Sequence, residues 1–210
     1  MTDLFPASEF DDWAETYDCS VSDGQAFPFA GYTDLLQAIV RLAAPRPGLS
    51  VLDLGTGTGN LAILFARRGC DLWCTDFSAA MLAKARQKLP SARFALHNLR
   101  MPLPSEFDRK FDRIVSAYVF HHFPLAEKIR ILTSLAARQI SPTGRILIGD
   151  IAFPNRLTLE KIKAAAGDDW EDEHYWLADE AAPALENAGF KVEYIQVSPC
   201  AGVFSLQRAS

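Results

Sequence analysis

Short apolar runs alternate with amphipathic segments along most of the chain, and this alternation predicts the fold. Residues 29–44 place apolar side chains at helical spacing before Pro45 stops the helix. The following run, LSVLDLG, has no polar alternation, which is typical of a strand buried on both faces. Further strands are expected at DLWCTDF, ARFALHN, FDRIVSAYV and GRILIGDIAF, with helices between them, one of them from about Leu125 to Gln139. This rhythm predicts an open parallel sheet with helices on both faces.

The last part of the chain departs from that rhythm. A helix expected at ADEAAPALENAG precedes two apolar segments, FKVEYIQVS and GVFSLQRA, which only a short stretch around residues 199–201 separates. So short a link cannot hold a crossover, and the final pair should therefore be antiparallel. We predict an α/β fold of the Rossmann-like, doubly wound kind, with a seven-stranded sheet that is mostly parallel and ends in an antiparallel β-hairpin.

The sequence predicts a single domain over residues 1–210, because this length suffices for one core and no linker or repeat interrupts it. Within it we expect N-terminal cap helices (1–47), a cofactor-binding core (48–152), a lid-like insertion (153–176), and a C-terminal helix with the antiparallel hairpin (177–210). The insertion lies past the end of a strand, where α/β folds place lids and substrate contacts. A surface helix followed by a solvated charge run is the alternative for this segment.

Charge and cysteine content disfavour several classes of partner and site. The formal net charge of −5 argues against nucleic acid as a partner, because binding to phosphate backbones relies on clustered Lys and Arg. The four cysteines form no CxxC pair, which favours free structural thiols over zinc or disulfides. There is no signal-peptide segment and no apolar run of membrane-spanning length, so we expect a cytoplasmic protein without a membrane partner. The sequence leaves monomer and homodimer open.

A glycine loop follows the first buried strand, in VLDLGTGTGN. Gly55, Gly57 and Gly59 allow the backbone to turn tightly and to approach a ligand without a Cβ in the way. Asp76 ends the next strand, 17 residues after Gly59, where a carboxylate can accept hydrogen bonds from both ribose hydroxyls. Asp53, just before the loop, suits a cationic amino-acid group and would repel a pyrophosphate. The spacing also differs from the G-x-G-x-x-G of dinucleotide sites, so the sequence predicts S-adenosylmethionine and not NAD.

These motifs resemble those of class I S-adenosylmethionine-dependent methyltransferases, over almost the whole chain. VLDLGTGTG is similar to the first motif of that family, and TDFS is similar to its ribose-binding acidic turn. FDDWAETYD, FDRIVSAYVFHHF, GRILIGDIAF and the C-terminal EHYW and LENAGFKVEY most resemble the YrrT-like group of small bacterial methyltransferases. The resemblance implies methyl transfer (EC 2.1.1.-) to an acceptor that the sequence does not name. A non-catalytic S-adenosylmethionine-binding or regulatory protein with the same fold is the alternative.

The resemblance also implies roles for particular residues. The implied cofactor contacts are Gly55, Thr56 and Gly57 at the methionine part, Asp53 near its amino group, Asp76 on the ribose, Phe77 and Met81 beside the adenine, Asn98 or the backbone of Leu99 at the adenine amino group, and Ser116 beneath the sulfonium. The family often has an acidic residue after its third strand, whereas Asn98 contributes no charge there. Trp13 and Tyr17 are expected to fold over the cofactor. An ordinary capping helix that buries its aromatic side chains is the alternative.

Methyl transfer from a sulfonium needs little covalent help, because in-line approach and exclusion of water supply most of the rate. A base helps when the acceptor must lose a proton, and the candidates are His121, His122 and Tyr17, followed by Tyr118, Tyr175 and Trp176. SAYV stands after the fourth strand in place of a base-clamping NPPY signature, which favours a small-molecule acceptor.

The two adjacent histidines could also be metal ligands. Neighbouring side chains diverge in a strand or a helix, so we expect at most one of the pair to face the pocket. A metal site needs further ligands, and Cys74, His97 and His174 show no helpful spacing with the pair. We therefore expect no metal.

Overall fold

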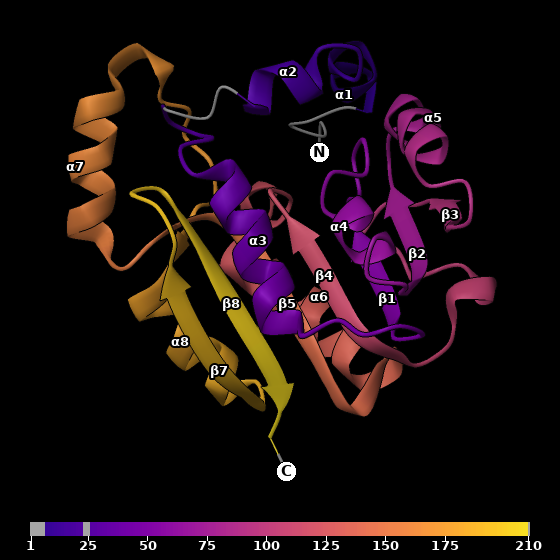
Figure 1. The fold of residues 1–210 in the computed structure, drawn as a ribbon. Coiled ribbons are helices and arrows are strands. Elements are labelled where there is room, and N and C mark those ends of the chain that lie inside the picture. Colours follow the sequence, from indigo (N-terminus) through magenta and orange to yellow (C-terminus); the bar gives the residue numbers. More distant parts are fainter. Residues whose placement is uncertain (1–6, 23–25, 210) are drawn as a thin grey trace.

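Seven strands form the central sheet, in the order β3-β2-β1-β4-β5-β8-β7 (Figure 1). The strands are β1 (Ser50–Leu54), β2 (Asp71–Asp76), β3 (Arg93–Leu96), β4 (Phe111–Ala117), β5 (Ile140–Phe153), β7 (Phe190–Gln196) and β8 (Ala201–Arg208). The first five run parallel, and β8 lies antiparallel between β5 and β7. The structure is a computed structural model that describes residues 7–22 and 26–209. The predicted topology is confirmed, and so is the antiparallel hairpin.

One further strand, β6 (Trp176–Leu177), pairs in parallel with the last residues of β5. The sequence does not predict it, because two residues are too few to show a periodicity. β6 brings the segment that precedes it, residues 170–175, to the carboxyl end of the sheet. That end also carries the glycine loop, since the registers pair Asp53 with Cys74 of β2 and with Val115 of β4.

Helices cover both faces of the sheet, as the alternation predicts. They are α3 (Tyr32–Ala43), α4 (Ala62–Ala66), α5 (Ala79–Lys88), α6 (Leu125–Arg138), α7 (Arg156–Ala166) and α8 (Ala178–Asn187), with single 3₁₀ turns at η1 (Ser105–Phe107), η2 (Phe120–His122) and η3 (Gly167–Asp169). β1 is buried along its whole length because one apolar cluster, including side chains of α3 and α4, lies on one face and a second, including those of α6 and α8, lies on the other. None of the described helices is long and apolar enough to cross a bilayer.

Two short helices, α1 (Ala7–Trp13) and α2 (Tyr17–Ser22), lie across the carboxyl ends of the strands (Figure 1). Asp11 accepts hydrogen bonds from the Ser78 hydroxyl (2.5 Å) and the Ala80 amide (3.2 Å) at the start of α5. Asp18 accepts from the Thr58 hydroxyl (2.5 Å) and pairs with Lys88 (2.6 Å). These polar contacts therefore join α1 and α2 to the glycine loop and to α5.

Candidate active site

The glycine loop is fitted against the segment that follows β4. Gly55 has φ +65°, and a Cβ there would lie 2.4 Å from a methyl carbon of Val119. No larger residue fits without moving that side chain. The amide of Thr56 donates to the Thr75 carbonyl (2.8 Å), which ties the loop to the end of β2. The loop and the turn that holds the two histidines are thus in direct contact.

Asp76 lies at the carboxyl end of β2 and joins that strand to the glycine loop. Its carboxylate is 6% exposed and accepts hydrogen bonds from the amides of Gly57 (2.7 Å) and Ser78 (2.9 Å). Burial raises the pKa of Asp76 to about 6, although the backbone hydrogen bonds act in the opposite direction. Asp76 is therefore a buried acceptor held beside the loop, as a ribose contact requires.

Asp53 is the second buried carboxylate of the site. It accepts a hydrogen bond from the Thr56 hydroxyl (2.7 Å) and is 1% exposed. Burial raises the pKa of Asp53 to about 7, and the neighbouring charge of Asp76 adds to this effect. A cationic group bound next to it would favour the ionised form, so the site is suited to an ammonium group.

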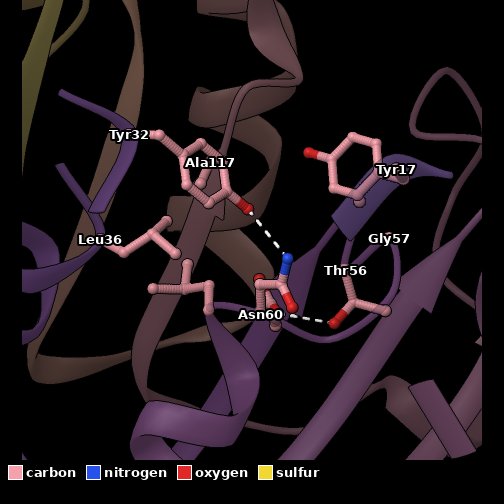
Figure 2. A pocket seen from close by; sticks show the side chains of 10 residues that line it. Tyr17, Tyr32, Leu36, Thr56, Gly57, Asn60 and Ala117 are labelled. Carbon is pink, nitrogen blue, oxygen red and sulfur yellow. Dashed lines mark hydrogen bonds between the residues drawn. The ribbon is translucent and has the colours of Figure 1, made fainter. Parts of the chain in front are cut away.

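A cavity of about 20 Å³ lies between Asp53, the glycine loop and the rings of Tyr17 and Tyr32. Figure 2 shows these two tyrosines facing the loop, with the amide of Asn60 donating to the Tyr32 hydroxyl (3.3 Å). The pockets that bind small molecules usually have volumes of about 300–1,000 Å³. The cavity is small because side chains of α2 and α3, Tyr17, Tyr32 and Leu36, occupy the space beside the loop.

Aromatic side chains of α1 and α2, the two helices that cover the carboxyl ends of the strands, fill the cleft. The Trp13 and Tyr17 rings are 4.8 Å apart, and Phe10 lies 4.9 Å from the Phe77 ring. Burial raises the pKa of Tyr17 well above its usual value, so its hydroxyl stays neutral and acts as a hydrogen-bond donor or acceptor. Phe10, which sequence reasoning missed, also lies 5.7 Å from the His122 ring and so connects Phe77 with the histidines.

The remaining predicted contacts are placed as follows. Met81 is buried in the first turn of α5, where its amide donates to the hydroxyl of Ser78, the N-cap of that helix. The Ser116 hydroxyl donates to the Leu54 carbonyl (2.7 Å) and so joins β4 to β1. Asn98 accepts from the Arg100 amide (3.0 Å) within its own loop, and Leu99 is half-buried.

The two histidines converge on one partner, so the expectation that their side chains diverge is wrong. Their ring centroids are 4.1 Å apart. His121 Nε2 lies 3.7 Å from one carboxylate oxygen of Glu173, and His122 Nδ1 lies 3.3 Å from the other. The reason is local: η2 is a single tight turn and neither a strand nor an α-helix, and Glu173 reaches it from the segment between η3 and β6.

Other buried groups that the sequence did not indicate surround this pair. Asp150, in β5, lies 2.6 Å from His121 Nδ1 and accepts from the Trp176 indole (3.0 Å). Lys128, 1% exposed, donates to the His174 carbonyl and lies 4.0 Å from the centre of the Trp176 ring. Burial alone would lower the pKa of His121, but the charge and hydrogen bond of Asp150 raise it above its usual value.

Comparison with known proteins agrees with this geometry. A family described as "Methyltransferase domain" matches residues 51–144, which contain the loop and β1 to β4. An uncharacterized methyltransferase of Geobacillus thermodenitrificans is 34% identical over 200 residues, covering 89% of each chain. The uncharacterized methyltransferase YrrT of Bacillus subtilis is 31% identical over 198 residues, covering 89% of this chain and 90% of YrrT.

A solved structure described as "DhpI-SAM-HEP complex" superposes with a TM-score of 0.76 at 20% identity, over 99% of both chains. This similarity concerns the fold, whereas the bacterial relatives share about a third of their residues with this chain over nearly its full length. Sheet order, glycine loop and relatives agree: the chain belongs to the class I S-adenosylmethionine-dependent methyltransferases, in the group of bacterial enzymes that includes YrrT.

Proposed function

We propose that the chain binds S-adenosylmethionine in the cleft between the glycine loop and α1–α2 and transfers its methyl group to a small-molecule acceptor. The observation that carries this proposal is the Asp76 carboxylate, buried at the end of β2 and hydrogen-bonded to the amide of Gly57. A carboxylate in contact with the loop backbone would hold the ribose of a ligand beside its methionine part, which supports the proposal.

The remaining cofactor contacts follow from this placement. In the proposed complex Asp53 pairs with the ammonium group, Gly55 to Gly57 contact the methionine part, and Ser116 lies beneath the sulfonium. Phe77 and Met81 flank the adenine. Because the side-chain oxygen of Asn98 already accepts from Arg100, we assign the adenine amino group to the backbone of Leu99. Trp13 and Tyr17 close over the ligand from α1 and α2.

The acceptor is proposed to be small because the site is enclosed. α1 and α2 cover the cleft from one side, and the segment before β6 is bound to η2, where the His174 amide donates to the His121 carbonyl (3.0 Å). The net charge of −5 also disfavours a polyanionic acceptor. His121 and His122 are the groups of this site that can handle the acceptor's proton, and Tyr17 positions the reactants as a neutral hydroxyl.

A labelling screen tests the acceptor class. The protein is incubated with S-adenosylmethionine carrying an isotopic label on the methyl carbon, together with separated metabolite, RNA and protein fractions of a bacterial extract. We expect label only in the metabolite fraction, and a heat-denatured sample as control should transfer none. Label in RNA or protein would contradict the small-molecule proposal, and no transfer to any fraction would favour a non-catalytic binding protein.

A second test concerns the cover over the cleft. Asp18 accepts from Thr58 and Asn60 (2.9 Å) and pairs with Lys88, so its contacts must break if α2 moves aside for the cofactor. We expect Asp18→Asn to speed association of S-adenosylhomocysteine roughly five-fold, the equivalent of about 1 kcal/mol for a half-exposed ion pair. Stopped-flow tryptophan fluorescence measures the rate, with Asp12→Asn, on exposed α1 surface, as control. Equal rates for both variants would mean that these contacts do not limit entry.

A further inference from the structure

Three side chains of the kinds that bind metals converge at the carboxyl end of the sheet. We propose that His121, His122 and Glu173 bind one divalent transition-metal ion. The two histidines come from η2, after β4, and Glu173 comes from the segment before β6, so the site would fix that segment to the sheet. Each residue offers one ligand atom, and these atoms all lie within 4.8 Å of one another.

The distances between the histidines and Glu173 are close to those between two ligands of one metal ion, whereas the widest separation in the cluster, within 4.8 Å, must shorten when the ion binds. Zinc binds nitrogen and carboxylate oxygen at about 2.0–2.2 Å, which places neighbouring ligand atoms of a tetrahedron roughly 3.3–3.6 Å apart. The two histidine nitrogens lie 3.7 Å and 3.3 Å from the oxygens of Glu173. Hydrogen bonds between nitrogen and oxygen measure about 2.7–3.2 Å, so both separations are long for such bonds.

Asp150 supplies the outer partner that a metal-binding histidine usually has. Histidine ligands donate their second ring N–H to a carboxylate or a carbonyl, which fixes the ring and its tautomer. His121 Nδ1 lies 2.6 Å from Asp150, so its proton is held there and the Nε2 lone pair faces Glu173. The indole of Trp176 donates to the other oxygen of Asp150 (3.0 Å) and keeps this carboxylate in place.

The local charge balance leaves room for a cation. Asp150 and Glu173 are both nearly buried, and Lys128 is the one ammonium group packed beside them among the described residues. Metal binding requires both imidazoles to be neutral, and two carboxylates against one ammonium then leave a single negative charge. A divalent ion that carried one anionic ligand in addition to Glu173 would bring the net charge of the cluster to zero. The His122 side chain is 18% exposed, although its Nδ1 atom is buried.

Two imidazoles and one carboxylate suit zinc and similar ions, and three protein ligands leave a fourth position open. The role of this position rests on the proposed function, whereas binding of the ion does not. With the ion bound, both histidines would be ligands and not bases. An acceptor hydroxyl at the fourth position would then lose its proton to water, and its oxygen would form the bond to the methyl carbon. The electrons of the broken carbon–sulfur bond would stay on the sulfur of S-adenosylhomocysteine.

Cobalt titration of the metal-free full chain, without an affinity tag, tests the site. We expect one Co²⁺ per chain and the visible absorption of four-coordinate cobalt, which Zn²⁺ displaces. Glu173→Gln and His121→Ala should weaken Co²⁺ binding by more than about 100-fold, and Asp150→Asn by roughly 10–100-fold. The matched control is His174→Gln, which removes the exposed histidine of the same segment and should leave cobalt binding unchanged.

Circular dichroism and S-adenosylhomocysteine binding, measured on the same samples, show whether each variant is folded. The proposal is overturned if the wild-type chain binds no cobalt, if Glu173→Gln and His121→Ala bind it as the wild type does, or if His174→Gln loses it. A wild-type chain that binds cobalt but not S-adenosylhomocysteine would contradict the proposed function and leave the metal site standing.

Discussion

Replacing Asp76 with alanine should abolish binding of S-adenosylmethionine and S-adenosylhomocysteine while the chain stays folded. In the proposed complex the carboxylate accepts hydrogen bonds from both ribose hydroxyls. Hydrogen bonds to a charged group contribute about 1.5–3 kcal/mol each, so losing two should weaken binding by more than about 100-fold. No other acidic side chain in the described part of β2 can take over, because Asp71 lies at the opposite end of that strand.

The fold should tolerate the change because two effects offset each other. The amides of Gly57 and Ser78 lose an acceptor, but a buried carboxylate whose pKa burial has raised to about 6 is also removed. Calorimetry measures the affinity and circular dichroism the melting temperature, with Asp71→Ala as the matched control. Unchanged affinity in Asp76→Ala would mean that the ribose lies elsewhere.

Replacing Asp53 with asparagine should weaken cofactor binding and at the same time stabilise the protein without cofactor. The asparagine can still accept from Thr56 but offers no charge to the ammonium group of the methionine part, so we expect an affinity loss of about 10- to 100-fold. Wild-type affinity should also fall as the pH drops below about 7, because protonation removes the same charge. In Asp53→Asn this pH dependence should be weaker.

The stability effect has a definite sign. The pKa of Asp53 is about 7 in the folded chain against an ordinary value of 3.8, so between these values the folded state holds a proton that the unfolded state has lost. The free energy of unfolding therefore falls as the pH rises through this window and is flat above it. At pH 8 the free energy of unfolding of Asp53→Asn should exceed that of the wild type by roughly 2–4 kcal/mol, and near pH 4 this difference should vanish.

Thermal denaturation at pH 4, 6 and 8 measures this gain. Asp112→Asn is the control, because hydrogen bonds from Ser50 lower the pKa of Asp112 although partial burial opposes them. The Asp112 variant should lose stability at pH 8, where the Asp53 variant gains it. An Asp53→Asn protein that melts below the wild type at pH 8 would contradict the assignment of Asp53 as a desolvated carboxylate.

Local patterns predicted most of the fold and the proximity of Asp53, the glycine loop and Asp76. The continuous apolar run at β1 fixes a doubly buried strand, and the loop and acid that follow it are close in sequence, so Asp53, Gly55 and Asp76 could be placed from spacing alone. The hairpin of β7 and β8 followed from the short link between them. The two-residue β6 could not be predicted, because its formation depends on the end of β5 and on no pattern of its own.

The cluster of His121, His122 and Glu173 depends on contacts between distant residues. Glu173 meets His121 and His122 across about fifty residues, and a single sequence gives no sign of this pairing. Asp150 could have been identified from the sequence, since it is the acidic residue near the carboxyl end of the fifth predicted strand. The convergence of the histidines does not follow from strand or helix geometry, because η2 is a lone 3₁₀ turn. The contact of Asn98 with Arg100 likewise depends on how its loop closes.

Titration calorimetry with S-adenosylhomocysteine, S-adenosylmethionine and NAD tests the central assignment most directly. The geometry of Asp53, the glycine loop and Asp76 predicts one site per chain for the two sulfur ligands and no measurable heat with NAD. Tight binding of NAD alone would contradict it, because a pyrophosphate would then have to lie beside the charge of Asp53.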